Sequence, residues 1–359
     1  MARSGQHGGN VLQMAARAGL DPALVLDFSA NINPLGMPAR LRAAIPAQLD
    51  RLERYPDIDY QQLYTALARH TGCGTEQILA GNGATELIFA LTRHLKPRRA
   101  LLPVPGFAEY RRALQREGCA IINFLLLESE DFQLTPRLLD ALTPDLDCLF
   151  LCTPNNPTGQ QPASDLLLQI LERCQQLGIQ LIVDESFIDF LPDNRGLQPV
   201  LDRYDCLYLL RSLTKFYAIP GLRLGYLLAG DRARLARIKE QQEPWTINAL
   251  AALAGETVLE DRRYQANTHA WLAREQAYLL AALGALTGIK IWPPAANYLF
   301  LRCLDPALPL QERLLEQGIL IRHCANYPGL GPDFYRVAIR SHEDNRRLVA
   351  ALTRIVGHG

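Results

Sequence analysis

The sequence predicts an α/β protein with a mostly parallel sheet covered by helices on both faces, followed by a second, smaller α/β domain. Short apolar runs alternate with helical patterns from residue 78 to residue 229, which is typical of parallel strands joined by crossover helices. After a long helical stretch, strand-like and helical patterns alternate a second time near the end of the chain. In addition, polar motifs come directly after the apolar runs, at the carboxyl ends of strands, where ligands bind in such sheets.

Composition excludes several classes of protein. The 359 residues are 48% hydrophobic and 21% charged, which suits a soluble chain with a large core. The 37 basic and 37 acidic side chains cancel, so we expect neither nucleic acid nor a membrane surface as a partner. The eight cysteines are scattered without a C-x-x-C pair, which indicates buried thiols in a reducing compartment. Because the start lacks an apolar signal-peptide core and no run could span a bilayer, we predict a cytoplasmic protein.

The elements are expected in the following order. Residues 1–35 are irregular apart from a helix near 11–18, and a helical stretch over 45–69 is interrupted at 54–57. A helix is expected over 164–177, and helical periodicity returns over 248–286, before a closing helix at the end of the chain. Strands are predicted at 78–80, 100–104, 120–127, 148–152, 180–183, 205–210, 224–229, 297–302, 319–323 and 334–339. We therefore divide the chain into an N-terminal segment that joins the small domain (1–44), a large domain (45–260) and a small domain (261–359).

Two glycine-containing segments are candidate anion sites. In His7-Gly8-Gly9-Asn10, consecutive glycines let backbone N–H groups converge on an anion, and His7 could add a donor; the alternative is a flexible tail. In the segment 81–86, a glycine turn leads from a strand to a helix N-terminus with Thr85 in its first turn. The alternative there is ordinary capping of that helix. The segment 27–36, with two asparagines, suits either a loop or a substrate-facing turn.

Two further motifs follow strand ends. The segment 153–159, Thr-Pro-Asn-Asn-Pro-Thr-Gly, is a rigid loop that presents the Asn156 amide, which suits recognition of one ring oxygen. Asp184 ends an apolar run, where a carboxylate is costly unless a cation pairs with it. A protonated pyridine nitrogen is such a cation. The alternatives are a plain Asn-Pro turn for Asn156, and a helix cap or a metal ligand for Asp184, although no His or Cys lies nearby at ligand spacing.

The segment 212–226 contains Lys215 among hydroxyl side chains, with Arg223 eight positions further along the chain. Hydroxyls and a guanidinium suit a phosphate. A partly desolvated lysine beside a cation is poised to be a neutral amine, as Schiff-base chemistry requires. The alternative is a solvated loop lysine. Taken together, a lysine for an aldehyde, an aspartate for a pyridinium, an asparagine for a phenolic oxygen and phosphate donors predict pyridoxal 5′-phosphate as the cofactor.

With these motifs in place, the chain resembles the fold-type I pyridoxal-phosphate enzymes of the class I/II aminotransferase group over nearly its whole length. Within that group it is similar to the histidinol-phosphate aminotransferase branch, and more closely to the threonine-phosphate decarboxylases of cobalamin biosynthesis. The segments that carry the closer match are 7–10, 27–36, 105–110, 211–217 and 324–329. The resemblance implies a large domain with a seven-stranded sheet and a homodimer.

The resemblance also implies roles for single residues. Lys215 would hold the cofactor covalently and later move a proton, Asp184 would pair with the ring nitrogen, and Asn156 would bind the ring oxygen. Phe107 would stack on the ring, and Tyr55 would reach the phosphate from the partner subunit. The other phosphate ligands would be Ala84, Thr85, Ser212 and Arg223. Arg336 would bind the substrate carboxylate. The pocket for the rest of the substrate, including its phosphate, would be lined by His7, Gly8, Asn31 and Arg322. Surface ion pairs are the alternative for the two arginines, but both lie on adjacent apolar strand candidates, where their burial demands anionic partners.

One departure bears on the reaction. Phe187 stands where many relatives of the aminotransferase branch carry a tyrosine that helps to hold the ring oxygen. The absence of that tyrosine hydroxyl puts efficient transamination in doubt, and it is compatible with cleavage of a different bond of the substrate. We therefore expect decarboxylation of O-phospho-L-threonine to (R)-1-aminopropan-2-yl phosphate. An aminotransferase acting on histidinol phosphate is the alternative. A non-enzymatic regulator with this fold is disfavoured because the chain is neutral and begins close to a motif.

Overall fold

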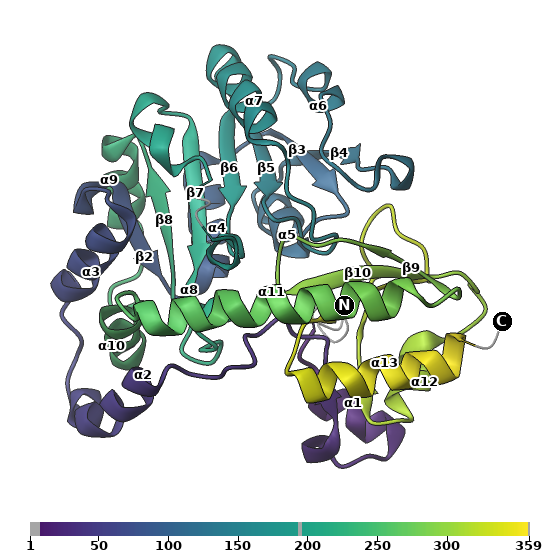
Figure 1. The fold of residues 1–359 in the computed structure, drawn as a ribbon. Helices are drawn as coiled ribbons and strands as arrows, with labels where there is room; N and C mark the ends of the chain where they lie inside the picture. Colours follow the sequence, from purple (N-terminus) through teal and green to yellow (C-terminus); the bar gives the residue numbers. More distant parts are fainter. Residues whose placement is uncertain (1–7, 193–195, 358–359) are drawn as a thin grey trace.

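The computed structural model of the chain describes residues 8–192 and 196–357. Its largest element is a seven-stranded sheet flanked by helices, which confirms the predicted fold class (Figure 1). The strands lie in the order β2 (Ile78–Gly81), β8 (Gly225–Ala229), β7 (Leu207–Ser212), β6 (Gln180–Asp184), β5 (Cys148–Cys152), β3 (Arg99–Val104) and β4 (Ala120–Leu125). Only β8 runs antiparallel to its neighbours β2 and β7, so the sheet is mostly parallel, as predicted.

Alternating side chains of the strands supply two separate hydrophobic cores, one on each face of the sheet. On β5, Leu149 and Leu151 belong to one core, whereas Phe150 belongs to the other. The helices that cover the two faces are α3 (Gln61–Thr71), α4 (Gly83–Leu95), α5 (Ala108–Arg116), α6 (Arg137–Asp140), α7 (Ser164–Leu177), α9 (Arg232–Glu240) and α10 (Ala249–Val258). Because the strands are buried on both faces, their runs are continuously apolar, and this made them recognisable in the sequence.

The second sheet has four antiparallel strands in the order β12 (Arg322–His323), β13 (Phe334–Ala338), β10 (Tyr298–Cys303) and β9 (Ile289–Trp292). Helices α12 (Leu310–Leu315) and α13 (His342–Val356) accompany it, and the long helix α11 (Arg262–Gly284) runs from the large sheet toward it (Figure 1). Strand β9 was not predicted, because it has four residues and one of them is a lysine. The domain boundaries at 44 and 260 stay a prediction.

Two sequence expectations differ from the structure in detail. The single strand predicted over 319–323 is two strands in different sheets: β11 (Ile319–Leu320) pairs in parallel with β1 (Leu26–Asp27), and β12 pairs with β13. The helical stretch predicted over 45–69 contains a 3-10 segment at Pro46–Glu53, and regular helix begins only with α3. It is preceded by α2 (Ala39–Ala44), whereas α1 (Val11–Ala18) lies where it was predicted. Within the described residues, no helix is both long and apolar enough to cross a membrane.

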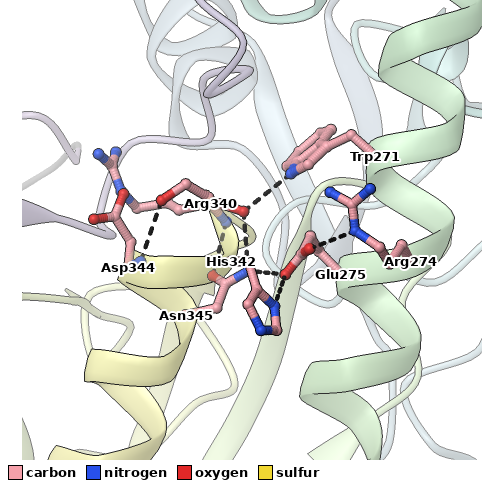
Figure 2. A network of polar contacts seen from close by, with 8 residues as sticks. Trp271, Arg274, Glu275, Arg340, His342, Asp344 and Asn345 are labelled. Carbon is pink, nitrogen blue, oxygen red and sulfur yellow. Dashed lines mark hydrogen bonds and ion pairs between the residues drawn. The ribbon is translucent and has the colours of Figure 1, made fainter.

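A polar network around the buried Glu275 carboxylate fixes α11 against the start of α13 (Figure 2). The Glu275 carboxylate, with a fully buried side chain, accepts hydrogen bonds from Arg274 (2.8 Å), His342 (3.1 Å) and Asn345 (3.1 Å). These donors hold the pKa of Glu275 below its usual range despite its burial. The adjoining Arg340 donates to the carbonyl of Asp27 at 3.0 Å, so the network also holds the N-terminal segment that leads into the pocket described next.

Candidate active site

An open pocket of about 490 Å³ lies between the two sheets, where residues from distant parts of the chain meet. Its wall includes Gly8, Asn31, Phe107, Asn156, Phe187, Lys215, Tyr327 and Arg336. Six of these were predicted site residues, and Phe187 was singled out as a departure. The pocket opens beyond the carboxyl ends of β5, β6 and β7, which is where the sequence placed the site.

Lys215 lies on the short helix α8 (Leu213–Phe216), immediately after β7. Its amine, half-buried, donates to the hydroxyl of Ser212 at 3.0 Å and lies 5.9 Å from the centre of the Phe187 ring. Burial lowers the pKa of Lys215; the negative charge of Asp184 opposes this shift, and the positive charge of Arg223 adds to it. Lowering this pKa enlarges the neutral fraction of the amine, which is the nucleophilic form.

Three of the predicted phosphate ligands, Ala84, Thr85 and Arg223, lie together at the start of α4. Gly83 has φ +79°, and a Cβ there would lie 2.5 Å from an Arg223 guanidinium nitrogen, so only glycine lets the arginine approach this helix end. Arg223 is itself held at φ +62°, a strained backbone conformation for a non-glycine residue. Ala84 and Thr85 occupy the first turn. Asn82 precedes the helix without a side-chain capping bond in the described structure, which disfavours the capping alternative for Asn82.

Asp184 ends β6 with its side chain almost fully buried. One carboxylate oxygen, Oδ1, accepts from the backbone N–H of Ser186 at 2.9 Å, and the other, Oδ2, accepts from the hydroxyl of Tyr110 at 2.6 Å. Among the described residues, histidine, cysteine and acidic side chains do not form a group of three that could hold a metal ion. The carboxylate is therefore aimed and hydrogen-bonded in a buried position, as a partner of a cationic ring nitrogen must be.

Asn156 is oriented by two neighbours. Its side-chain oxygen accepts hydrogen bonds from the Arg336 guanidinium and from the Tyr327 hydroxyl, the latter at 3.5 Å. Because both interactions engage Oδ1, the amide nitrogen is left to donate to a ligand in the pocket. An amide fixed in this direction suits the binding of an oxygen acceptor.

Arg336 and Arg322 face each other across β13 and β12 and are both buried, with 5% and 6% exposure. Directly opposite residues of an antiparallel pair point to the same face of the sheet. Arg336 lines the pocket and donates to the carbonyl of Ser29 at 2.8 Å. Arg322 instead lines a neighbouring hollow of about 750 Å³, where it donates to Asn326 at 2.7 Å. Ser29 borders both cavities, so they adjoin.

The N-terminal segment closes one side of the pocket. The Gly9 N–H donates to the Ser29 hydroxyl at 2.8 Å, and a Cβ on Gly8 would lie 2.0 Å from the Ser29 carbonyl oxygen. Asn31 is 6% exposed, and its side-chain oxygen has no hydrogen-bond partner among the described residues, which leaves an acceptor for a ligand donor. His7, also predicted to line the pocket, lies outside the described residues.

Tyr55 does not reach this pocket. Its side chain is 81% exposed, and its ring lies 4.7 Å from that of Trp245, beside a separate hollow of about 840 Å³ that also includes Arg51 and Arg54. A single chain therefore leaves Tyr55 apart from Lys215, and its contact from a partner subunit stays a prediction.

Sequence reasoning missed several residues that build the site. Tyr327 and Ser29 lie in segments already singled out, but nothing in the pattern selected them. Asn33 holds the lysine helix by donating to the carbonyls of Lys215 (3.1 Å) and Phe216 (2.8 Å). Behind the site, a buried ion pair at 2.6 Å between Glu185 and Arg211 joins the ends of β6 and β7. The tandem Asp184-Glu185 was the available signal for this second carboxylate.

The fold and the site together define a class. Residues 23–352 match the family model described as aminotransferase class I and II, so the chain belongs to this family. It is 55% identical over 350 residues to the threonine-phosphate decarboxylase of Salmonella typhimurium, covering 98% of this chain and 96% of that protein. The adenosylcobalamin biosynthesis bifunctional protein of Leptospira interrogans is 33% identical, over 98% of this chain and 41% of its own length.

Among solved structures, the histidinol-phosphate aminotransferase from Clostridium acetobutylicum superposes with a TM-score of 0.87. It is 29% identical, and the match covers 93% of this chain and all of that one. The chain thus shares its fold with a histidinol-phosphate aminotransferase, while its sequence is similar to that of a threonine-phosphate decarboxylase.

The residues present fit pyridoxal 5′-phosphate. A half-buried amine of lowered pKa suits its aldehyde, and the Arg223 guanidinium packed on a helix N-terminus suits its phosphate. The buried Asp184 carboxylate suits its ring nitrogen, and the Asn156 amide suits its ring oxygen. Each chemical feature of the cofactor therefore has a matching group at one end of the large sheet.

Proposed function

We propose that the protein is a pyridoxal-phosphate-dependent decarboxylase that converts O-phospho-L-threonine to (R)-1-aminopropan-2-yl phosphate in cobalamin biosynthesis. The observation that carries the proposal is the pair of buried, facing arginines beside the Lys215 pocket, since this substrate has two anionic groups. The 55% identity with the Salmonella decarboxylase over nearly the whole chain supports the same reading. The neutral charge and scattered cysteines are in keeping with a cytoplasmic enzyme.

The chain's own residues divide the work of holding the cofactor. Lys215 would bond to the aldehyde carbon, while Ala84, Thr85, Ser212 and Arg223 would hold the phosphate. Phe107 would stack on the ring, Asp184 would pair with the ring nitrogen, and Asn156 would donate to the ring oxygen. When bound, pyridoxal phosphate supplies a ring that accepts the electron pair left on the substrate Cα.

The reaction then depends on orientation. The bond from Cα to the carboxylate carbon breaks, CO₂ leaves, and the electron pair of that bond forms the new C–H bond when a proton replaces the lost group. We assign delivery of that proton to the Lys215 amine. The bond that breaks is the one held perpendicular to the ring, so substrate-binding residues decide the outcome. We assign the carboxylate to Arg336, and the substrate phosphate to Arg322 together with His7, Gly8 and Asn31.

Transamination of histidinol phosphate is the alternative, because the fold and cofactor residues serve both reactions. The alternative finds some support in the likeness to the Clostridium aminotransferase. Phe187 weighs against it. This residue is 5% exposed and adjoins the lysine amine, yet it offers the ring oxygen no hydroxyl.

One assay separates the two functions. Purified protein with pyridoxal phosphate is expected to release CO₂ from O-phospho-L-threonine at the same rate with or without 2-oxoglutarate. Incubation with histidinol phosphate and 2-oxoglutarate serves as the comparison. Formation of glutamate there, without CO₂ release from phosphothreonine, would overturn the proposal in favour of the aminotransferase.

We also propose that the enzyme is a homodimer in which Tyr55 completes the phosphate site of the other subunit. Tyr55 is flanked in the sequence by other large exposed apolar side chains, Leu49, Leu52 and Ile58, with 49%, 55% and 56% exposure. Apolar groups gathered in this way mark interaction surfaces. A twofold interface would place each Tyr55 against the other subunit.

Coexpression of two inactive variants tests the dimer. Lys215→Ala removes the amine, and Tyr55→Ala removes the phosphate contact from the other subunit. In a mixed dimer one of the two sites is native, so random pairing is expected to restore about a quarter of wild-type activity at limiting cofactor. Activity no higher than the average of the two variants alone would contradict shared sites, and each variant expressed alone is the control.

A further inference from the structure

Tyr110 hydrogen-bonds Asp184 and is not among the residues that line the Lys215 pocket. It comes from α5, 74 residues earlier in the chain, and its side chain is 4% exposed. Its hydroxyl donates to Asp184 Oδ2 at 2.6 Å, a short bond to a buried carboxylate. With the Ser186 N–H on Oδ1, each carboxylate oxygen thus has one donor from the protein.

The Tyr110 ring is held so that its hydroxyl has little freedom. It stacks on Phe150 with ring centres 5.3 Å apart, and it meets the edge of Phe107 at 5.6 Å. Phe107 is the residue assigned to the face of the cofactor ring. A single side chain therefore contacts both the group expected on the ring face and the group expected at the ring nitrogen.

Burial, reinforced by the negative charge of Asp184, raises the pKa of Tyr110 well above its usual value, so the phenol remains a donor at working pH. The other titratable groups that interact with Asp184 are Cys152 on β5, Lys215 on α8 and Tyr298 on β10. Burial raises the pKa of Cys152 to about 12 and that of Tyr298 well above its usual value, so both stay neutral.

We propose that Tyr110 is a positioning residue that acts through Asp184: its hydrogen bond fixes the carboxylate in the orientation in which it would pair with the cofactor nitrogen. The inference rests on the proposed cofactor. Hydrogen bonds to the charged form of a buried carboxylate favour that form. Without the phenol, the Ser186 N–H is the one remaining donor in the described contacts of this carboxylate, and the ion pair with a protonated ring nitrogen weakens.

The test compares two cofactors in full-length apoprotein: pyridoxal 5′-phosphate and its 1-deaza analogue, in which carbon replaces the ring nitrogen. The analogue makes no ion pair with Asp184, so a hydrogen bond that stabilises the ionised carboxylate matters less for its binding. Tyr110→Phe keeps the ring and removes only the hydroxyl. We expect it to lower the preference for pyridoxal phosphate over the analogue, measured as a ratio of dissociation constants, roughly 5- to 10-fold.

Tyr208→Phe is the matched control, since Tyr208 belongs to the same buried core and its hydroxyl binds Arg234 at 3.1 Å instead of Asp184. It is expected to leave the ratio unchanged. If Tyr110→Phe weakens both cofactors equally, the residue is merely structural and the inference falls while the cofactor assignment stands. If the wild-type protein itself does not distinguish the two cofactors, the role of Asp184 falls and the inference with it.

An Asp184→Asn background provides a second, independent test of the same hydrogen bond. There the amide cannot form the ion pair, so adding Tyr110→Phe is expected to leave the ratio where Asp184→Asn put it. A further fall of the same size in that background would overturn the proposal.

Discussion

Replacing Lys215 with alanine is expected to abolish the visible absorbance of the bound cofactor and to lower kcat/KM roughly 10⁴-fold or more. The amine is the group assigned both to the aldehyde carbon and to the proton that replaces CO₂, so one substitution removes two functions. Burial lowers its pKa, and Lys215 is the lysine among the described residues that line the pocket, so another lysine is not placed to stand in. The measurements are an absorption spectrum of the reconstituted protein and CO₂ release from phosphothreonine.

Lys239→Ala is the control for this experiment. Lys239 lies on α9 with its amine 4.7 Å from the centre of the Tyr64 ring, away from the pocket wall, and its loss is expected to leave spectrum and activity unchanged. A Lys215→Ala protein that retained a normal cofactor spectrum would refute the assignment of the site. Retention of the spectrum by Lys239→Ala, with its loss in Lys215→Ala, would locate the covalent bond.

The sequence predicted the large sheet well because its strands are buried on both faces. Continuous apolar runs such as 148–152 and 180–184 are recognisable without knowing what they pack against. It predicted the small sheet less well, since a short strand that carries a lysine, such as β9, differs little from a loop. The division of 319–323 between two sheets depends on pairing with β1, which lies hundreds of residues earlier in the sequence, and with β13. The local sequence pattern does not imply either pairing.

The same physics separates the predictable part of the site from the rest. Asn156, Asp184 and Lys215 are polar residues that follow apolar runs. Because burying a polar group costs free energy, their position indicates a functional role. Tyr110 carries no such mark, because an aromatic residue on an amphipathic helix is ordinarily a core residue. Its hydrogen bond to Asp184 forms only when α5 packs on the sheet, so the local sequence does not indicate it. Tyr55 could be assigned by resemblance alone, because a single chain leaves it 81% exposed.

Arg336 joins the cofactor and substrate parts of the site. Its guanidinium holds the oxygen of Asn156 and the carbonyl of Ser29, and Ser29 in turn receives the Gly9 N–H. Arg336 would therefore fix the position of a substrate carboxylate relative to the amide that binds the ring oxygen and to the N-terminal segment over the pocket. Orientation relative to the ring, on which decarboxylation depends, is a property of this group of contacts as a whole.

Arg336→Met is accordingly expected to lower kcat/KM for phosphothreonine roughly 10²- to 10³-fold, because one partner of a buried charged pair is removed. The reaction product lacks the carboxylate but keeps the phosphate, so its inhibition constant is expected to stay nearly unchanged in this variant. Arg322→Met is expected to weaken product binding instead. Arg302→Met, on the adjacent strand β10 and paired with Asp333 and Glu128, is the control that leaves both constants unaltered. Equal weakening of substrate and product by Arg336→Met would instead place the phosphate at Arg336 and exchange the roles of the two arginines.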